Sequence, residues 1–201
     1  MRDASLRRKK DDILNPLADR FLGSVHPNVI SVIAMVVGLA SVAAIMGRFY
    51  WLGLALWGAN RILDGLDGVV ARAHGKQSDF GGYLDLILDF VVYLAIPAAF
   101  VYVNPTALNL WALVLLFAIY VINTLSWTLL STILEKRAMQ SSGRLTTIEM
   151  PPGLIEGAET IAFYTLFYFL PEYSGILFII FGLLVLFTAG QRVWWAAKNL
   201  Q

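Results

Sequence analysis

The chain of 201 residues contains no cysteine and only 2 histidines. The absence of cysteine excludes disulfides, thiolate nucleophiles and cysteine-based zinc sites. Charge is also scarce, because charged residues make up 14% of the chain, against about 25% in an ordinary soluble domain. A net charge of +1 gives no electrostatic basis for binding nucleic acid. Hydrophobic residues reach 58% and the mean hydropathy is +0.68, so the composition predicts a membrane protein.

Apolar stretches of membrane-spanning length recur along the chain and are separated by polar or proline-containing connections. A helix needs about 20 apolar residues to cross a bilayer. The predicted helices cover residues 27–46, 49–63, 81–103, 108–134, 154–170 and 175–190. We expect a loop over residues 138–152 and a tight turn over residues 171–174. The pattern predicts an all-α integral membrane protein in which residues 26–201 form one domain with six transmembrane helices.

The N-terminal residues 1–25 differ from this pattern. The cations at residues 7–10 are followed at once by Asp11 and Asp12, so the apolar core of a signal peptide is missing. Apolar residues then recur with helical spacing. We expect an amphipathic helix on the membrane surface, and the alternative is a solvated tail.

The positive charges indicate an orientation. They gather in the N-terminal segment, in the connections after the second and fourth apolar stretches, and at the C-terminus, whereas the opposite side carries only Arg48. Cytoplasmic loops are enriched in lysine and arginine. Both termini and the charged loops are therefore expected in the cytoplasm, with the protein in a bacterial or archaeal cell membrane.

Carboxylates occur where an apolar helix would normally exclude them. Asp64, Asp67, Asp85 and Asp89 lie within 26 residues, and intramembrane carboxylates usually serve a function because their insertion is costly. The first two are three residues apart and the last two are four apart, so each pair shares one helix face. A short connection makes the two helices antiparallel neighbours, and the two pairs are expected to face each other.

Four clustered carboxylates repel one another unless protons or cations intervene. Oxygen donors suit hard cations such as Mg²⁺ or Mn²⁺, and two sites are feasible. A metal pair can stabilise the displacement of a phosphoryl group. The glycines around the aspartates leave bare backbone for a phosphate ligand, although small residues also serve close helix packing.

The pattern Asp64-x2-Asp67-Gly68-x2-Ala71-Arg72-x8-Gly81-x3-Asp85-x3-Asp89 resembles the motif of the CDP-alcohol phosphotransferases. All eight motif positions are present at the family spacing. The six-helix layout and the His26-Pro27-Asn28 start of the first helix extend the resemblance. It implies a homodimeric membrane enzyme that moves a substituted phosphate from a CDP-linked lipid donor to an alcohol hydroxyl and releases CMP.

The resemblance also implies roles for individual residues. Asp64, Asp67 and Asp85 would bind the divalent metals, and Asp89 would share one and act as the general base. The residues expected at the CDP site are Asn28, Asp64, Gly68, Ala71, Arg72 and Gly81.

The acceptor is less defined by the sequence. A phosphorylated acceptor, such as glycerol 3-phosphate or inositol phosphate, needs cations, and the candidates are Lys76, Lys136 and Arg137. Ordinary cytoplasmic loop charge is the alternative reading of these cations. Glu156 and Glu159 are three residues apart. They could hold an amine-bearing acceptor, pair with Lys136 or Arg137, or hydrogen-bond sugar hydroxyls.

Two alternatives remain open. The enzyme could instead transfer a CDP-linked choline or ethanolamine headgroup to diacylglycerol. A protein of another class, a cation or proton transporter, would also use intramembrane carboxylates, but it would not require Gly68, Ala71 and Arg72 beside them.

Overall fold

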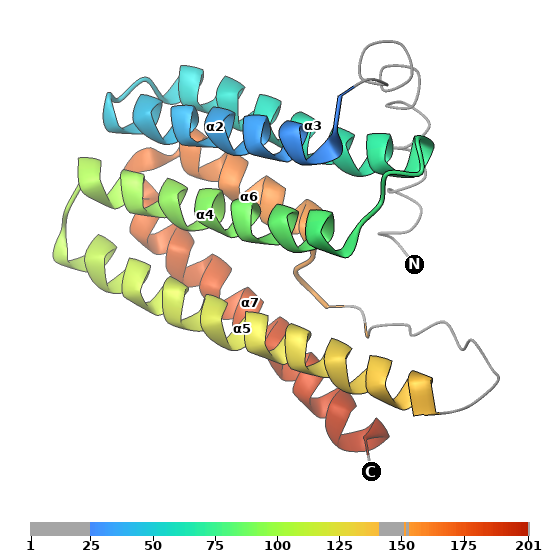
Figure 1. Ribbon diagram of the computed structural model, residues 1–201. Helices are drawn as coiled ribbons and strands as arrows, with labels where there is room; N and C mark the ends of the chain where they lie inside the picture. The colour runs from blue at the N-terminus through green and yellow to red at the C-terminus, as the bar shows by residue number, and fades with distance from the viewer. Residues whose placement is uncertain (1–24, 141–150, 152, 201) are drawn as a thin grey trace. The chain divides into compact units, whose positions relative to one another are not determined.

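The computed structural model describes residues 25–140, 151 and 153–200, and all regular structure in these residues is helical (Figure 1). The chain divides into two compact units. Unit 1 comprises Met1–Thr106 and Tyr164–Ser174, and unit 2 comprises Ala107–Phe163 and Gly175–Gln201. The predicted amphipathic segment falls on residues 1–25 and lies almost wholly outside the described residues.

Helix α2 spans Pro27–Met46, the bounds predicted for the first apolar stretch. Its start is fixed by His26, whose Nδ1 accepts a hydrogen bond from the backbone N–H of Asn28 at 3.3 Å, while Pro27 occupies a first-turn position that needs no N–H partner. The helix ends at Gly47. Arg48 then adopts a φ of 64°, which turns the chain into α3 (Tyr50–Ala73).

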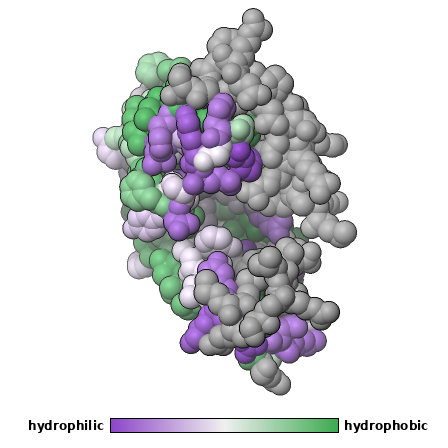
Figure 2. Space-filling model, turned by 45° about the vertical axis from the view of Figure 1, so that its right-hand side comes forward, coloured by the Kyte–Doolittle hydropathy of each residue, from purple (hydrophilic) through white to green (hydrophobic). Residues whose placement is uncertain are grey.

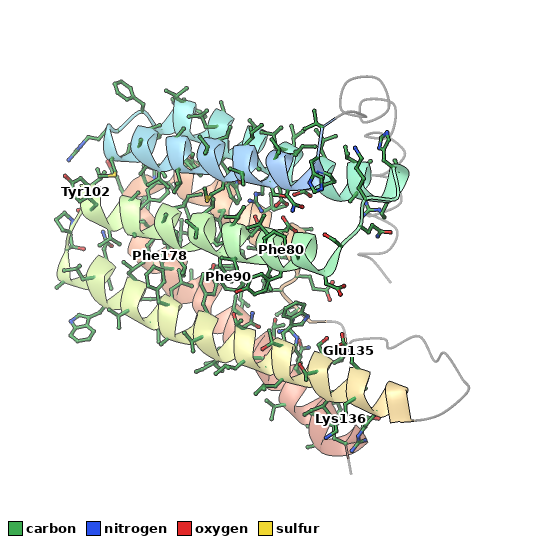
Figure 3. The ribbon with its side chains drawn as sticks, in the orientation of Figure 1. Phe80, Phe90, Tyr102, Glu135, Lys136 and Phe178 are labelled. Atoms are coloured by element: carbon green, nitrogen blue, oxygen red, sulfur yellow. The ribbon has the colours of Figure 1, made fainter. Side chains whose placement is uncertain are left out.

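Helix α4 spans Asp79–Val103 and begins two residues before the predicted start. The reason is Ser78, whose hydroxyl accepts a hydrogen bond from the N–H of Gly81 at 3.0 Å and so caps the first turn. Figure 3 shows Phe80 and Tyr102 at opposite ends of this helix.

Within unit 1, α2 packs against both α3 and α4 (Figure 1). Buried Asn60 on α3 donates from Nδ2 to the carbonyl oxygen of Ala34 on α2 at 2.8 Å. A close approach also occurs at Gly38, where a Cβ would lie 2.6 Å from a methyl group of Val92 on α4. The contact requires the smallest residue and brings the three helices together along their length.

Helix α6 spans Gly157–Phe169, and its C-terminal half belongs to unit 1. Tyr164 is fully buried there and donates from its hydroxyl to the carbonyl oxygen of Tyr93 at 2.6 Å. Its ring also stacks on Trp57, with 5.3 Å between ring centroids. A 3₁₀ turn at Pro171–Tyr173 follows, where the sequence predicts a tight turn.

Unit 2 contains α5 (Ala107–Gln140), the start of α6 and nearly all of α7 (Ser174–Asn199). Arg192 on α7 donates to Oδ1 of Asn123 on α5 at 2.7 Å, which joins the two long helices. The prediction of a loop from residue 138 was wrong for residues 138–140, because α5 continues through them.

Within the part of the chain that the structure describes, four helical segments are long and apolar enough to cross a membrane: Pro27–Met46, Asp79–Val103, Ala107–Arg137 and Pro171–Asn199. Helix α3 is absent from this set because its C-terminal half carries four charged side chains, and α6 because 13 residues rise only about 20 Å. In Figure 2, hydrophobic residues lie along the left edge of the view, and hydrophilic residues gather on the part of the surface that faces the viewer. The protein is therefore a membrane protein, and the count of six spans stays a prediction.

Candidate active site

A cavity of about 170 Å³ opens in unit 1 where the start of α2, the end of α3 and the start of α4 meet. All three helices and the α3–α4 connection contribute to its wall. The lining residues are Pro27, Asn28, Ser31, Asp67, Gly68, Ala71, Arg72, Lys76, Gln77, Ser78, Gly81, Gly82 and Asp85. Most residues of the connection are exposed, so the cavity lies at the polar end of these helices.

A second, narrower cavity, too tight to admit a water molecule, lies further along the same helices and shares Ser31 and Asp85 with the first. It is lined by Asp64 from α3 and Asp89 from α4. The four aspartates therefore meet across the α3–α4 interface, as the spacing of the two pairs predicts. Asp85 is the member common to both cavities.

Asp67 is held by α2. Its side chain is buried, with 6% exposure, and its Oδ2 accepts a hydrogen bond from the hydroxyl of Ser31. A buried carboxylate requires such a partner. The sequence analysis did not identify Ser31, because a single serine in an apolar helix gives no signal of its target.

Asp89 is held by Arg61, another residue that the sequence analysis left without a role. Arg61 lies on α3 and donates from NH2 to Oδ1 of Asp89 at 2.8 Å, with a longer contact of 3.4 Å from NH1 to Oδ2. Its NH1 also lies 3.7 Å from Oδ2 of Asp64. The spacing of Arg61 and Asp64, three residues apart on one helix, was a visible signal of this pair.

Glycine shapes the wall of the first cavity. A Cβ on Gly81 would lie 3.1 Å from Oδ1 of Asn28 and 3.1 Å from Oγ of Ser78. Gly82, the next residue, has no atom within 4 Å of such a Cβ. Gly81 therefore keeps space open between α2 and α4, whereas Gly82 faces an open region.

The residues predicted for the CDP site are gathered at these cavities. Asn28, Gly68, Ala71, Arg72 and Gly81 line the first cavity. Asp64 lines the narrower one. Their binding of CDP remains a prediction, but the positions assembled by the fold are the positions chosen from the motif.

The three acceptor candidates belong to different units of the chain. Lys76 lines the first cavity, whereas Lys136 and Arg137 belong to unit 2, near the end of α5 (Figure 3). Arg137 donates from NH1 to the carbonyl oxygen of Asn199 at 3.2 Å, so it caps the C-terminal end of α7.

Glu156 and Glu159 have local partners. Oε2 of Glu159 accepts a hydrogen bond from the backbone N–H of Glu156 at 3.1 Å, and Oε1 of Glu156 accepts one from the N–H of Gly153 at 2.9 Å. The first of these bonds is half of a capping box at the N-terminus of α6. Both acids thus have structural partners, which are backbone N–H groups rather than the predicted Lys136 or Arg137.

The donor set suits divalent ions by its chemistry. Four carboxylates from two facing helices supply only oxygen, which Mg²⁺ and Mn²⁺ prefer. Among the residues that the structure describes, no three His, Asp or Glu side chains converge in a metal-holding group as they stand. Ser31 and Arg61 contact three of the carboxylates instead, Asp67, Asp64 and Asp89. The four aspartates remain the residues that would hold the ions.

Comparison with known proteins finds a family model and a relative that each match most of the chain. The family model described as CDP-alcohol phosphatidyltransferase matches residues 24–197. The chain is also 30% identical over 171 residues to "Inner membrane protein YnjF" of Escherichia coli (strain K12), a match that covers 85% of this chain and 82% of that protein.

Two further relatives match over shorter lengths. One is the "Bifunctional IPC transferase and DIPP synthase" of Aquifex aeolicus (strain VF5), 35% identical over 105 residues, or 51% of this chain and 23% of the relative. Another is the "CDP-diacylglycerol--serine O-phosphatidyltransferase" of Mycobacterium tuberculosis (strain ATCC 25618 / H37Rv), 33% identical over 103 residues, or 49% of this chain and 35% of the relative. The chain therefore spans about a quarter to a third of these two proteins.

Proposed function

Because this chain belongs to the CDP-alcohol phosphatidyltransferase family, we propose that it transfers a phosphatidyl group from CDP-diacylglycerol to the hydroxyl of a polar alcohol and releases CMP. The observation that carries the proposal is the meeting of all four aspartates at two cavities that share Asp85. The same family membership argues against a cation or proton transporter. The names of the relatives support phospholipid synthesis without fixing the acceptor.

The donor would lie in the first cavity. A diphosphate is an anion that cationic and N–H donors can stabilise, and Arg72 and Lys76 both line this cavity. Gly81 leaves room for close approach to the backbone, and Asn28 stands opposite it. The lipid tails of the donor would extend along the apolar flank of the helices.

The reaction exchanges one phosphorus–oxygen bond for another. The acceptor oxygen bonds to the phosphorus of the phosphatidyl group, and the bond from that phosphorus to the bridging oxygen of CMP breaks. CMP leaves with the bridging oxygen and its electron pair. The proton of the acceptor hydroxyl passes to the carboxylate of Asp89, the general base of the proposal, because an alcohol is a poor nucleophile while it keeps its proton.

Divalent ions held by Asp64, Asp67, Asp85 and Asp89 would neutralise the charge of the diphosphate. We propose two ions, Mg²⁺ or Mn²⁺. The four carboxylates on α3 and α4 would supply their oxygen ligands, and Ser31 and Arg61 keep two of these side chains in place.

A phosphorylated acceptor, such as glycerol 3-phosphate or inositol phosphate, is the acceptor class we propose. Lys76 supports it, because this lysine lines the cavity that Asp67 and Asp85 also line. Lys136 and Arg137 remain candidates for the same role, although Arg137 already donates to the end of α7.

The membrane arrangement is also part of the proposal. Helix α3 has 24 residues, which rise about 36 Å, and it packs along α2. We propose that it crosses the bilayer beside α2 with its charged half facing the cavities, and that α6 completes six spans. Arg72 at the end of α3 and Lys76 in the α3–α4 connection support a site at the cytoplasmic surface. We also propose that the enzyme is a homodimer.

The test is an assay of CMP release by the purified chain in lipid with Mg²⁺ or Mn²⁺. CDP-diacylglycerol is supplied with glycerol 3-phosphate, inositol phosphate, inositol, serine or glycerol, and the lipid product is identified by mass spectrometry. CDP-choline and CDP-ethanolamine with diacylglycerol form the second arm. We expect CMP and a new lipid only in the first arm, and CMP only in the second arm would replace the proposed donor.

Asp89→Asn is the matched variant, because it keeps the size of the side chain and removes the base. CMP release should fall by about 100- to 10,000-fold, while CDP binding is retained. Arg48→Gln serves as the control, because Arg48 lies in the α2–α3 turn and contacts the carbonyl oxygen of Val103. Turnover of Asp89→Asn at the rate of the unchanged protein would exclude Asp89 as the base.

A further inference from the structure

Arg61 is an arginine in the middle of unit 1 whose side chain is only 8% exposed. A charged side chain in an apolar helix is costly unless it is paired. Every side of this guanidinium meets a partner, so its position is set by the packing of three helices rather than by solvent.

Aromatic rings and an amide fix the guanidinium. Its central carbon lies 4.7 Å from the ring centroid of Trp57 and 4.9 Å from that of Tyr93, which are cation–π distances. Nε donates to Oδ1 of Asn60 at 2.8 Å, and NH1 donates to the hydroxyl of Tyr93 at 2.9 Å. Asn60 is itself anchored to the backbone of α2.

NH2 and NH1 of the guanidinium contact the two carboxylate oxygens of Asp89. The strong bond, at 2.8 Å, goes to Oδ1, and only the 3.4 Å contact goes to Oδ2. A charge-assisted bond of the first kind fixes the orientation of a carboxylate. Arg61 therefore holds Oδ2 of Asp89 less tightly than Oδ1. Asp89 lines the narrower cavity.

Arg61 also supplies charge. It lies against both Asp64 and Asp89, so one fixed cation stands between members of the two carboxylate pairs. Like charges at close range repel strongly in a site removed from bulk water. The arginine relieves this repulsion without any bound ion, and in doing so it competes with divalent ions for the same carboxylates.

We propose that Arg61 is a positioning residue of the active site: it orients the carboxylate of Asp89 and acts as a built-in counter-ion between Asp64 and Asp89. The inference rests on the proposed function for its effect on turnover. The expected effect of Arg61 on ion binding follows from its contacts with Asp64 and Asp89 alone. The two effects have opposite signs, because loss of the arginine weakens catalysis and strengthens ion binding.

The experiment compares Arg61→Gln, Arg61→Lys and the control Arg48→Gln in the full-length chain. Michaelis–Menten analysis of CMP release separates kcat from KM, and Mn²⁺ binding is followed by electron paramagnetic resonance. For Arg61→Gln we expect kcat to fall by about 100-fold with KM for the donor unchanged. Mn²⁺ affinity should rise by about fivefold or more, since a competing cation is gone.

Arg61→Lys keeps the positive charge but loses the paired contacts of NH1 and NH2 with the two oxygens of Asp89. It should bind Mn²⁺ as the unchanged protein does and recover only part of kcat. A merely structural role for Arg61 would give the opposite sign, namely weaker Mn²⁺ binding and a higher KM in Arg61→Gln, and would overturn the proposal. An unchanged kcat with unchanged Mn²⁺ affinity would overturn it as well.

Two outcomes need a second measurement. If Arg61→Gln does not fold, Tyr93→Phe replaces it, because this variant keeps the ring and removes the hydroxyl that accepts the hydrogen bond from NH1 of Arg61. We then expect kcat to fall by about threefold. An unchanged kcat in Tyr93→Phe would overturn the proposal. If the unchanged protein releases no CMP from any donor, the proposed function fails, and the direction of the Mn²⁺ affinity change in Arg61→Gln decides the role of Arg61 by itself.

Discussion

The hydroxyl of Ser31 on α2 donates a hydrogen bond to Oδ2 of Asp67 on α3. Asp67 lines the first cavity, and its side chain is otherwise buried among α2, α3 and α4. The bond therefore joins the first helix of unit 1 to the carboxylate cluster. The uncharged helix α2 contributes to the site both through this bond and through Asn28.

Ser31→Ala removes the donor and leaves Asp67 buried. The free energy of unfolding should fall by about 1.5–3 kcal/mol, the contribution of one hydrogen bond to a charged group. Thermal unfolding without divalent ions is the measurement. Ser126→Ala is the control, because the hydroxyl of Ser126 bonds only to a carbonyl oxygen in its own helix. Equal melting temperatures for the two variants would contradict the prediction.

Gly81→Ala should impair the donor site, because the new Cβ would lie 3.1 Å from Oδ1 of Asn28 and from Oγ of Ser78. We expect KM for the CDP-linked donor to rise by about tenfold, the equivalent of about 1.4 kcal/mol. Gly58→Ala adds the same methyl group on α3, at a position that lines neither cavity and where nothing lies within 4 Å. Its KM should stay within about twofold of the unchanged protein, and the prediction fails if both variants behave alike.

Gly38→Ala should destabilise unit 1. The added Cβ would approach the two methyl groups of Val92 to 2.6 and 2.8 Å, and overpacking of this kind costs about 1–3 kcal/mol. Gly58→Ala is the matched change within α3, since nothing lies within 4 Å of its Cβ. It should stabilise the helix by about 0.5–1 kcal/mol. Thermal unfolding of both variants checks the opposite signs.

Glu159→Ala should loosen α6 and leave acceptor choice unchanged. Loss of the bond to the N–H of Glu156 should cost about 1 kcal/mol, whereas Glu159→Gln keeps an acceptor oxygen and should cost less. Hydrogen exchange of the α6 amides measures the first effect, and the acceptor panel measures the second. A selective loss of amine-bearing acceptors in both variants would show that Glu159 binds substrate instead.

The positions of the helices were largely readable from the sequence. The bounds of α2 follow from an uncharged run between Pro27 and the Gly47-Arg48 pair, and the structure has the same bounds. The starts of α4 and α6 differ from the prediction by two and three residues, because hydrophobicity alone does not reveal which residue caps a helix. The extension of α5 to Gln140 has the same origin, since a helix can continue through polar residues.

Only part of the candidate site could be predicted from the sequence. Spacing of three and four residues placed the aspartates on facing helix surfaces, because helical periodicity is a local property. The hydrogen-bond partners of the carboxylates could not be predicted from the sequence, because they depend on how different helices pack against one another. Tyr93 meets Arg61 across the α3–α4 interface, and Ser31 meets Asp67 across the α2–α3 interface.

The turn at Gly47–Phe49 has a consequence at the other end of unit 1. It joins α2 to α3 with three residues, so it sets how far α3 is rotated about its own axis relative to α2. One additional residue within α3 before Arg61 would rotate everything after it by about 100°. Ser31 would then face a different side of α3, and the carboxylates would leave their cavities together. The turn at one end of α3 therefore helps to determine which side chains of α3 face the cavities at its other end.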